Sequence, residues 1–263
     1  MLLATKSMEQ ASVHVSGDAN VAAASIKALL ATAGSAIAAA EEDDVIAKLA
    51  AETRRFTGHV LHTVKDPVTQ MDAIDPKTGQ AVLVPTCATV ITPKCLATFA
   101  HDRKWKGGDE VEVKLHPAAD TTSMRAVKTK VAIINTNADF IILEADTELQ
   151  APDMDAGIKA GTKFYGHGMS SPGHAANVYR GVITSANVEK YGLVFGDIAS
   201  GKGDSGGGVF SATTGELMGL MVGRNRGLQK SCIIPAASLV TIAVALSKEG
   251  PMDPDPPPSD LPF

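Results

Sequence analysis

The chain has 263 residues, of which 44% are hydrophobic and 20% charged, so it can bury the core of one large domain or of two small barrels. Its net charge of -5 excludes the basic surplus that is typical of nucleic-acid-binding proteins. The three cysteines, Cys87, Cys95 and Cys232, are too few for a disulfide framework, and they indicate a reducing compartment.

Residues 1–56 are predicted to form an alanine-rich helical extension. A helix is expected from Asp18 to Phe56, because alanine has the highest helix propensity and Asp18 or Asn20 can cap the start. Gly34 is a candidate break between two helices. Spacings of three and four residues, typical of an amphipathic helix, separate the apolar residues Ile26, Leu29, Leu30, Ala33 and Ile37.

No segment of the chain is predicted to insert stably into a membrane. The stretch Val21–Ala40 is interrupted by Lys27, and its charge-free part of about 13 residues is too short to span a bilayer. As a signal peptide this stretch starts late and has no basic region before it, so a cytoplasmic location is expected. Ala38–Ala40 before Glu41 does resemble a cleavage site, and export stays an open alternative.

From residue 57 the chain changes to short β-rich segments that alternate with clusters of turn residues. This pattern predicts a mainly β fold, a sandwich or barrel, in place of βαβ units. A C-terminal helix is expected over Ala236–Ser247, and the proline- and aspartate-rich tail 251–263 is expected to be disordered. The expected strands are His59–Val64, Ala81–Val84, Cys87–Ile91, Glu110–Leu115, Lys128–Asn135, Phe140–Leu143, Lys163–Gly166, Val178–Ser185, Leu193–Phe195, Gly208–Ser211 and Leu217–Val222.

The segment Gly203–Gly207, with the sequence Gly-Asp-Ser-Gly-Gly, is the strongest chemical signal in the chain. Glycines on both sides of Ser205 allow backbone conformations that side chains would block, and they leave room for N–H groups that stabilise an oxyanion. The same residues match the nucleophile elbow of α/β-hydrolases, which requires an acid and then a histidine after the serine. All seven histidines precede Ser205, so that fold is excluded.

Two segments upstream of Ser205 resemble the trypsin/chymotrypsin family of serine peptidases. Phe99-Ala100-His101 is similar to the Ala-Ala-His that ends a strand in that family, and Asn137–Leu143 is similar to the strand that carries its aspartate, here Asp139. The order His, Asp, Ser is that of chymotrypsin. Asp146 and Asp120 are alternative acids, and His167 is an alternative base.

The resemblance covers residues 56–248 and implies a chymotrypsin-like fold. The expected architecture is two six-stranded Greek-key β-barrels over residues 57–250, between the N-terminal helical extension and the C-terminal helix. The spacings of 38 residues from His101 to Asp139 and 66 from Asp139 to Ser205 are short, as in compact viral or bacterial members.

The resemblance also implies the activity of a serine endopeptidase that works through an acyl-enzyme. Ser205 would be the nucleophile, His101 the general base and Asp139 the residue that orients the imidazole, with an oxyanion hole built from the N–H groups of Gly203 and Ser205. The expected partner is a polypeptide substrate, without nucleic acid, cofactor or metal. One expected role is the processing of a viral polyprotein in the host cytoplasm, and the alternative is a catalytically silent peptide-binding module.

Four residues are expected to contact substrate, by alignment with the family. Ala199 takes the place of the pocket-floor acid of trypsin, so a preference for basic residues is not expected, and Val222, Gly223 and Arg224 would form the substrate-pairing edge. Val222 also stands where the family has a serine that supports the catalytic aspartate, so backbone groups alone would hold Asp139.

The chain has no sequence that resembles the activation site of trypsins. Without the new N-terminus that such a site releases, Asp204 needs another partner, and no proteolytic activation is expected. The oligomeric state and the physiological substrate stay open.

Overall fold

The computed structural model describes residues 19–63, 68–69, 71–101, 103–117, 123–155, 157–171, 175–186, 192–198, 200–225, 227 and 229–248. The predicted disordered tail 251–263 and the predicted pocket-floor residue Ala199 lie outside these residues. The chain divides into two compact units, Met1–Lys48 and Leu49–Phe263. The second unit contains both barrels and begins inside the N-terminal helix.

The N-terminal helix α2 is continuous over Ala19–Thr53 and is followed by a 3-10 turn, η1, over Arg54–Phe56. The predicted break at Gly34 is therefore wrong. A glycine inside a helix costs about 1 kcal/mol relative to alanine, and the alanines around Gly34 outweigh this single penalty. Within the described part of the chain, no helix is both long enough and apolar enough to cross a membrane.

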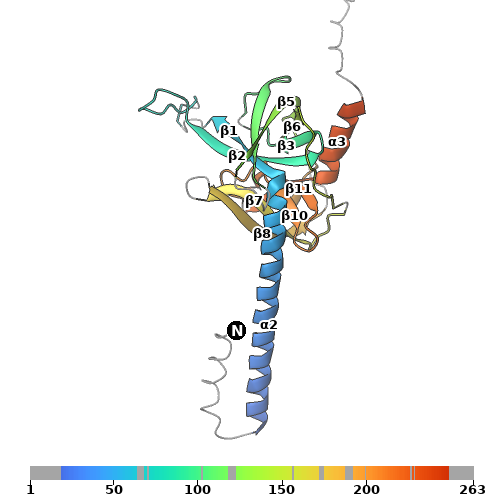
Figure 1. Cartoon of the computed structure of the whole chain (residues 1–263). Helices are drawn as coiled ribbons and strands as arrows, with labels where there is room; N and C mark the ends of the chain where they lie inside the picture. The colour runs from blue at the N-terminus through green and yellow to red at the C-terminus, as the bar shows by residue number, and fades with distance from the viewer. Residues whose placement is uncertain are drawn as a thin grey trace, which may run out of the picture. The chain divides into compact units, whose positions relative to one another are not determined.

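The first barrel closes in the strand order β1-β2-β3-β6-β5-β4, with all neighbours antiparallel. Figure 1 shows its strands β1, β2, β3, β5 and β6 grouped together. Most of its buried side chains are small or aliphatic, and they also include Phe140 and the threonines Thr86, Thr89, Thr98 and Thr129. The strands are β1 (Thr57–Thr63), β2 (Leu83–Thr92), β3 (Cys95–Thr98), β4 (Glu110–Leu115), β5 (Arg125–Asn135) and β6 (Phe140–Ala145).

The second barrel closes in the order β10-β11-β12-β9-β8-β7. Its core cluster consists of Phe164, Ile183, Val194, Val209, Met218, Met221 and Ile233. The strands are β7 (Lys163–Ser171), β8 (Ala175–Ser185), β9 (Val194–Gly196), β10 (Gly208–Ser211), β11 (Leu217–Asn225) and β12 (Lys230–Pro235). Two closed six-stranded barrels confirm the predicted fold class.

The strand predictions need correction at β2, β3 and β12. The strand expected at Cys87–Ile91 and the end of the one expected at Ala81–Val84 are parts of the single strand β2, which begins at Leu83 and runs through Pro85. Ala81 lies outside β2 and forms an isolated bridge with Ile74. Pro85 is tolerated because it faces Leu61 of β1, while the paired part of β2 on the β3 side begins only at Thr89. Strands β3 and β12 were not expected; β3 pairs with β2 and β6, and β12 pairs with β11 and β9.

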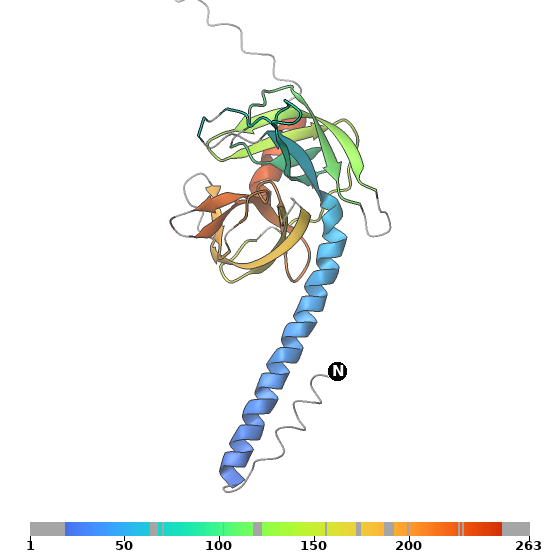
Figure 2. The same ribbon diagram turned by 90° about the vertical axis from the view of Figure 1, so that its left-hand side faces the viewer.

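The C-terminal helix α3 (Ala236–Lys248) confirms the prediction of a helix at the end of the second barrel. Its buried residues Ala236, Leu239 and Ala243 recur at spacings of three and four, which places them on one face. The helix contacts β2 of the first barrel and both β11 and β12 of the second (Figure 2). It therefore helps to hold the two barrels together.

Candidate active site

The three residues of the predicted triad lie in connections between strands, outside the barrel cores. His101 follows the end of β3, Asp139 is the last residue of the turn between β5 and β6, and Ser205 precedes β10. Strand β3 pairs with β6, so the chain segments that carry His101 and Asp139 are neighbours in the first barrel. Ser205 comes from the second barrel.

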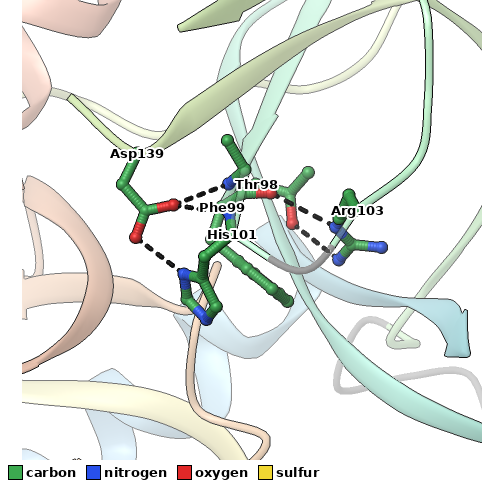
Figure 3. Close-up of polar contacts among 6 residues, drawn as sticks. Thr98, Phe99, His101, Arg103 and Asp139 are labelled. Atoms are coloured by element: carbon green, nitrogen blue, oxygen red, sulfur yellow. Dashed lines mark hydrogen bonds and ion pairs between the residues drawn. The ribbon is translucent and has the colours of Figure 1, made fainter. Parts of the chain in front are cut away.

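His101 and Asp139 are in direct contact. The Nδ1 atom of the His101 imidazole lies 2.7 Å from Oδ2 of Asp139 (Figure 3). The other carboxylate oxygen, Oδ1, accepts hydrogen bonds from the backbone N–H groups of Ala100, at 3.0 Å, and His101, at 2.7 Å. The carboxylate is therefore held by the same chain segment that carries the imidazole, and a neutral His101 bonded in this way presents Nε2 as its proton acceptor.

The backbone at Asp139 is in the left-handed region, with φ of 60°. Only glycine, asparagine and aspartate adopt this conformation readily. The turn is stabilised by the side chain of Asn135, whose Oδ1 accepts a hydrogen bond of 2.9 Å from the N–H of Ala138. Asn135 in turn pairs with Phe140 across the β5–β6 hairpin, so the turn fixes where the Asp139 carboxylate points.

The Ser205 loop is attached to the first barrel through β2. The carbonyl of Ser205 accepts a hydrogen bond of 3.1 Å from the N–H of Cys87, and the Gly206 carbonyl accepts one of 2.9 Å from the Thr89 hydroxyl. The carbonyl of Cys87 accepts a further bond, 2.7 Å long, from the hydroxyl of Thr98, three residues before His101. The backbone of Ser205 is thus connected to the strand that leads to His101.

Glycine is required at position 206 by both conformation and space. Gly206 has φ of 87°, and a Cβ atom there would overlap the carbonyl of Cys87 and lie 2.7 Å from the Thr98 hydroxyl oxygen. This close approach brings the loop onto the first barrel.

In the described part of the chain the hydrogen bond of the His101 side chain goes to Asp139, and no such bond joins it to the Ser205 hydroxyl.

The predicted oxyanion hole lies in the loop before β10. Gly203 has φ of 106°, a conformation that a side chain would strain. Among the described residues, the N–H groups of Gly203 and Ser205 donate no backbone–backbone hydrogen bond. The role of these two groups stays a prediction.

Asp204, beside the nucleophile, is buried with 2% exposure, and its partners are backbone amides. Oδ1 accepts hydrogen bonds of 3.1 Å from the N–H groups of Met169 and Ser170, and Oδ2 accepts one of 2.7 Å from Gly201. A buried carboxylate needs such donors to offset its lost hydration. Gly168 belongs to the same arrangement, because a Cβ atom there would overlap the carboxylate.

Three of the four predicted substrate-binding residues lie at the end of β11. Val222 is buried, Gly223 is half-buried and Arg224 is exposed. Gly223 and Arg224 pair on one side with Cys232 and Ser231 of β12. A Cβ atom at Gly223 would have no neighbour within 4 Å, so there is open space beside this part of the strand.

His167, the alternative base, is buried and has other contacts. Its Nε2 atom lies 3.0 Å from the Thr53 hydroxyl, which also contacts the Tyr165 hydroxyl at 3.0 Å. Because Thr53 gives its one hydrogen to the Leu49 carbonyl, Nε2 of His167 is the donor in this contact. Burial, followed by the charges of His116 and Arg54, lowers the pKa of His167 to about 3.

His116, which follows β4, is buried close to these groups. Burial, then Arg54 and His59, lowers its pKa to about 4. Its ring centroid lies 6.2 Å from that of His59. Both His116 and His167 are therefore neutral at physiological pH, and neither has the exposure of His101.

The two alternative acids lie elsewhere. Asp146 follows β6, and its N–H donates to the Lys128 carbonyl at 3.1 Å. Asp120 lies outside the described residues.

Comparisons with known proteins support the fold alone. No family model and no curated protein matches the sequence. Among solved structures, the chain is similar to the HtrA-type protease AlgW with decapeptide, with a TM-score of 0.57 over 78% of this chain and 68% of that chain, at 18% sequence identity. Together with the two closed barrels, this similarity confirms that the chain has the two-barrel fold of trypsin-like serine proteases.

Proposed function

We propose that this protein is a serine endopeptidase with a triad of Ser205, His101 and Asp139. The observation that carries the proposal is the contact of 2.7 Å between His101 Nδ1 and Asp139 Oδ2, in a chain that also has a Gly-Asp-Ser-Gly-Gly loop and a trypsin-like double barrel. Function cannot be assigned from this fold alone. The two backbone N–H groups that fix the carboxylate add support, because they orient the imidazole before substrate binds.

The first half of the reaction forms the acyl-enzyme. Ser205 Oγ attacks the scissile carbonyl carbon while its proton passes to His101 Nε2, and Asp139 stabilises the resulting imidazolium. The N–H groups of Gly203 and Ser205 stabilise the negative charge on the carbonyl oxygen. When the C–N bond breaks, His101 returns the proton to the leaving amine.

In the second half, water attacks the acyl carbon and gives its proton to His101. The C–Oγ bond then breaks, His101 protonates Ser205 Oγ, and a carboxylic acid product leaves. The catalytic contact between Oγ and Nε2 need not be formed without substrate, because such contacts are often longer in the free enzyme and shorten in the complex.

The amide donors around Asp204 support an enzyme that is active without proteolytic cleavage. Three backbone N–H groups from two segments already satisfy the carboxylate next to the nucleophile. The loop therefore needs no newly released N-terminus to hold it.

The three cysteines Cys87, Cys95 and Cys232 are all free, which fits a reducing compartment. We propose a cytoplasmic polypeptide as the substrate, and a viral polyprotein is one such substrate.

A catalytically silent peptide-binding module is the second candidate. The observation in its favour is that His101 makes its hydrogen bond to Asp139 and none to the Ser205 hydroxyl in the described part of the chain. The two candidates differ in whether Ser205 is nucleophilic, so a chemical probe of that atom separates them.

The test is covalent labelling of the full-length chain with a fluorophosphonate, followed by peptide mapping. We expect the label on Ser205 and cleavage of a peptide library, and the loss of both in Ser205→Ala. Ser211→Ala is the matched control and should keep both, because the hydroxyl of this buried serine of β10 accepts hydrogen bonds from the turn amides of Thr213 and Thr214. Peptide binding without labelling by a folded protein would establish the silent module.

A further inference from the structure

A column of four stacked side chains extends from the proposed base into the first barrel. The ring centroids of His101 and Phe99 lie 4.3 Å apart, and the Cζ atom of Arg103 lies 4.2 Å from the Phe99 centroid. The same Cζ atom lies 4.2 Å from the ring centroid of Trp105. Figure 3 shows the Phe99 ring between the imidazole and the guanidinium. We call His101, Phe99, Arg103 and Trp105 the stacked column.

Hydrogen bonds fix the guanidinium within this column. Arg103 Nε donates to the Phe99 carbonyl at 3.2 Å, and Nη2 donates to the hydroxyls of Thr86 at 2.8 Å and Thr98 at 3.2 Å. The N–H of Arg103 donates to the Ala100 carbonyl at 3.2 Å, which closes the turn that contains His101. Arg103 therefore holds this turn by both its backbone and its side chain.

The bond to Thr98 also connects Arg103 to the nucleophile loop. The Thr98 hydroxyl accepts from Arg103 and gives its own hydrogen to the Cys87 carbonyl. The N–H of the same residue, Cys87, donates to the Ser205 carbonyl. A chain of three hydrogen bonds thus leads from the guanidinium to the backbone of the proposed nucleophile.

Desolvation of the Arg103 guanidinium reduces the free energy of unfolding. Desolvation lowers its pKa to about 9, against the opposing effects of Cys87 and Asp139, so the guanidinium is still charged at neutral pH. Within the described part of the chain its Nη1 atom is buried and has no hydrogen-bond partner. Replacing an ion that has lost its hydration with apolar groups is often neutral or stabilising, so this arrangement is weak evidence for a role in stability.

We propose that Arg103 is a positioning residue for the triad, which holds the Phe99 ring as the surface on which the His101 imidazole rests in contact with Asp139. This inference rests on the proposed function. Arg103 therefore keeps the His101 imidazole in place.

Two substitutions test this role. Arg103→Lys keeps a positive charge but loses the planar group that stacks between two rings, whereas Arg103→Met keeps an unbranched apolar chain and loses the charge. We expect both to lower kcat by about ten- to a hundredfold with little change in KM, because the base is displaced.

A readout that needs no turnover is the proton NMR signal of the His101 Nδ1–H group in the bond to Asp139. In the unsubstituted protein we expect one low-field signal, and in both Arg103 variants we expect it to broaden through exchange with water. Arg125→Met is the matched control, since this exposed arginine of β5 bonds only to the Thr147 hydroxyl among the described residues and should leave kcat and the signal unchanged.

A normal kcat and a normal Nδ1–H signal in folded Arg103 variants would overturn the inference. If the Arg103 variants do not fold, Trp105→Leu removes the half-exposed outer ring of the column, and an unchanged signal in that variant also overturns it. If the unsubstituted protein does not label with fluorophosphonate while the Nδ1–H signal still depends on Arg103, the proposed function fails and the positioning role stands.

Discussion

The buried histidines His116 and His167 make the fold sensitive to acid. Both are neutral in the folded protein, because burial and neighbouring positive charges lower their pKa values to about 4 and about 3. In the unfolded chain a histidine has a pKa of about 6.5. Below pH 6.5 the unfolded chain therefore binds more protons than the folded chain, so stability is fully present above that pH and is lost as the pH falls toward 4.

The size of the effect follows from the linkage between proton binding and folding. Each histidine that stays neutral only in the folded state costs about 1.4 kcal/mol for each pH unit below 6.5. At pH 4.5 the two histidines together remove about 5 kcal/mol, which is comparable to the whole stability of a small domain, about 5–15 kcal/mol. Partial unfolding between pH 5 and 4 is the expected result.

The assay is urea unfolding followed by circular dichroism at a series of pH values from 7 to 4.5. His167→Gln removes one titrating group and keeps an N–H donor for Thr53, so we expect it to lose stability at pH 7 but to show about half the pH dependence. The double variant with His116→Gln should lose most of the remaining pH dependence and keep a smaller part from His59, whose pKa is also lowered by burial and by Lys114. The reasoning is refuted if His167→Gln and the unsubstituted protein lose stability in parallel as the pH falls.

Three further predictions concern the site. Gly206→Ala places a Cβ atom against the carbonyl of Cys87, so the Ser205 loop must move away from the first barrel. We expect kcat/KM for peptide hydrolysis to fall about a hundredfold or more, and normal hydrolysis would contradict the contact between this loop and β2. Asp139→Asn keeps the left-handed backbone but favours the wrong imidazole tautomer, so kcat should fall by roughly 10⁴, and an unchanged rate would move the acid role elsewhere. Asp204→Asn replaces the carboxylate, which accepts from three backbone amides, with an amide group that has one weaker acceptor and one donor. The unfolding free energy should fall by about 2–4 kcal/mol, measured as a lower urea midpoint.

The fold class and the proposed triad could be predicted because their signals are local. Gly203–Gly207 carries its requirements for backbone conformation in five consecutive residues, and the position of every histidine before Ser205 removes the competing hydrolase fold. The alternation of short strands with turns predicts the barrels, because each strand buries its own side chains in the same interior.

The parts that were missed depend on contacts between distant residues. Strand β12 has a short apolar run whose strand character comes from pairing with β11 and β9 on either side. The partners of Asp204 are backbone N–H groups, which every residue has and no sequence pattern marks. Arg103 looks like an ordinary surface cation in the sequence, and no local pattern marks its hydrogen bonds to Thr86 of β2 and Thr98 of β3.

The left-handed backbone at Asp139 limits how this site can be lost in the course of evolution. Most substitutions there would strain the β5–β6 turn and reduce folding as well as chemistry, so selection for a stable fold removes them even where activity no longer matters. Asparagine and glycine are the two replacements that the turn accepts without strain. Descendants of this protein that keep the fold as silent binding proteins are therefore expected to carry one of these two residues at position 139, which makes that position a simple marker of retained or abandoned catalysis.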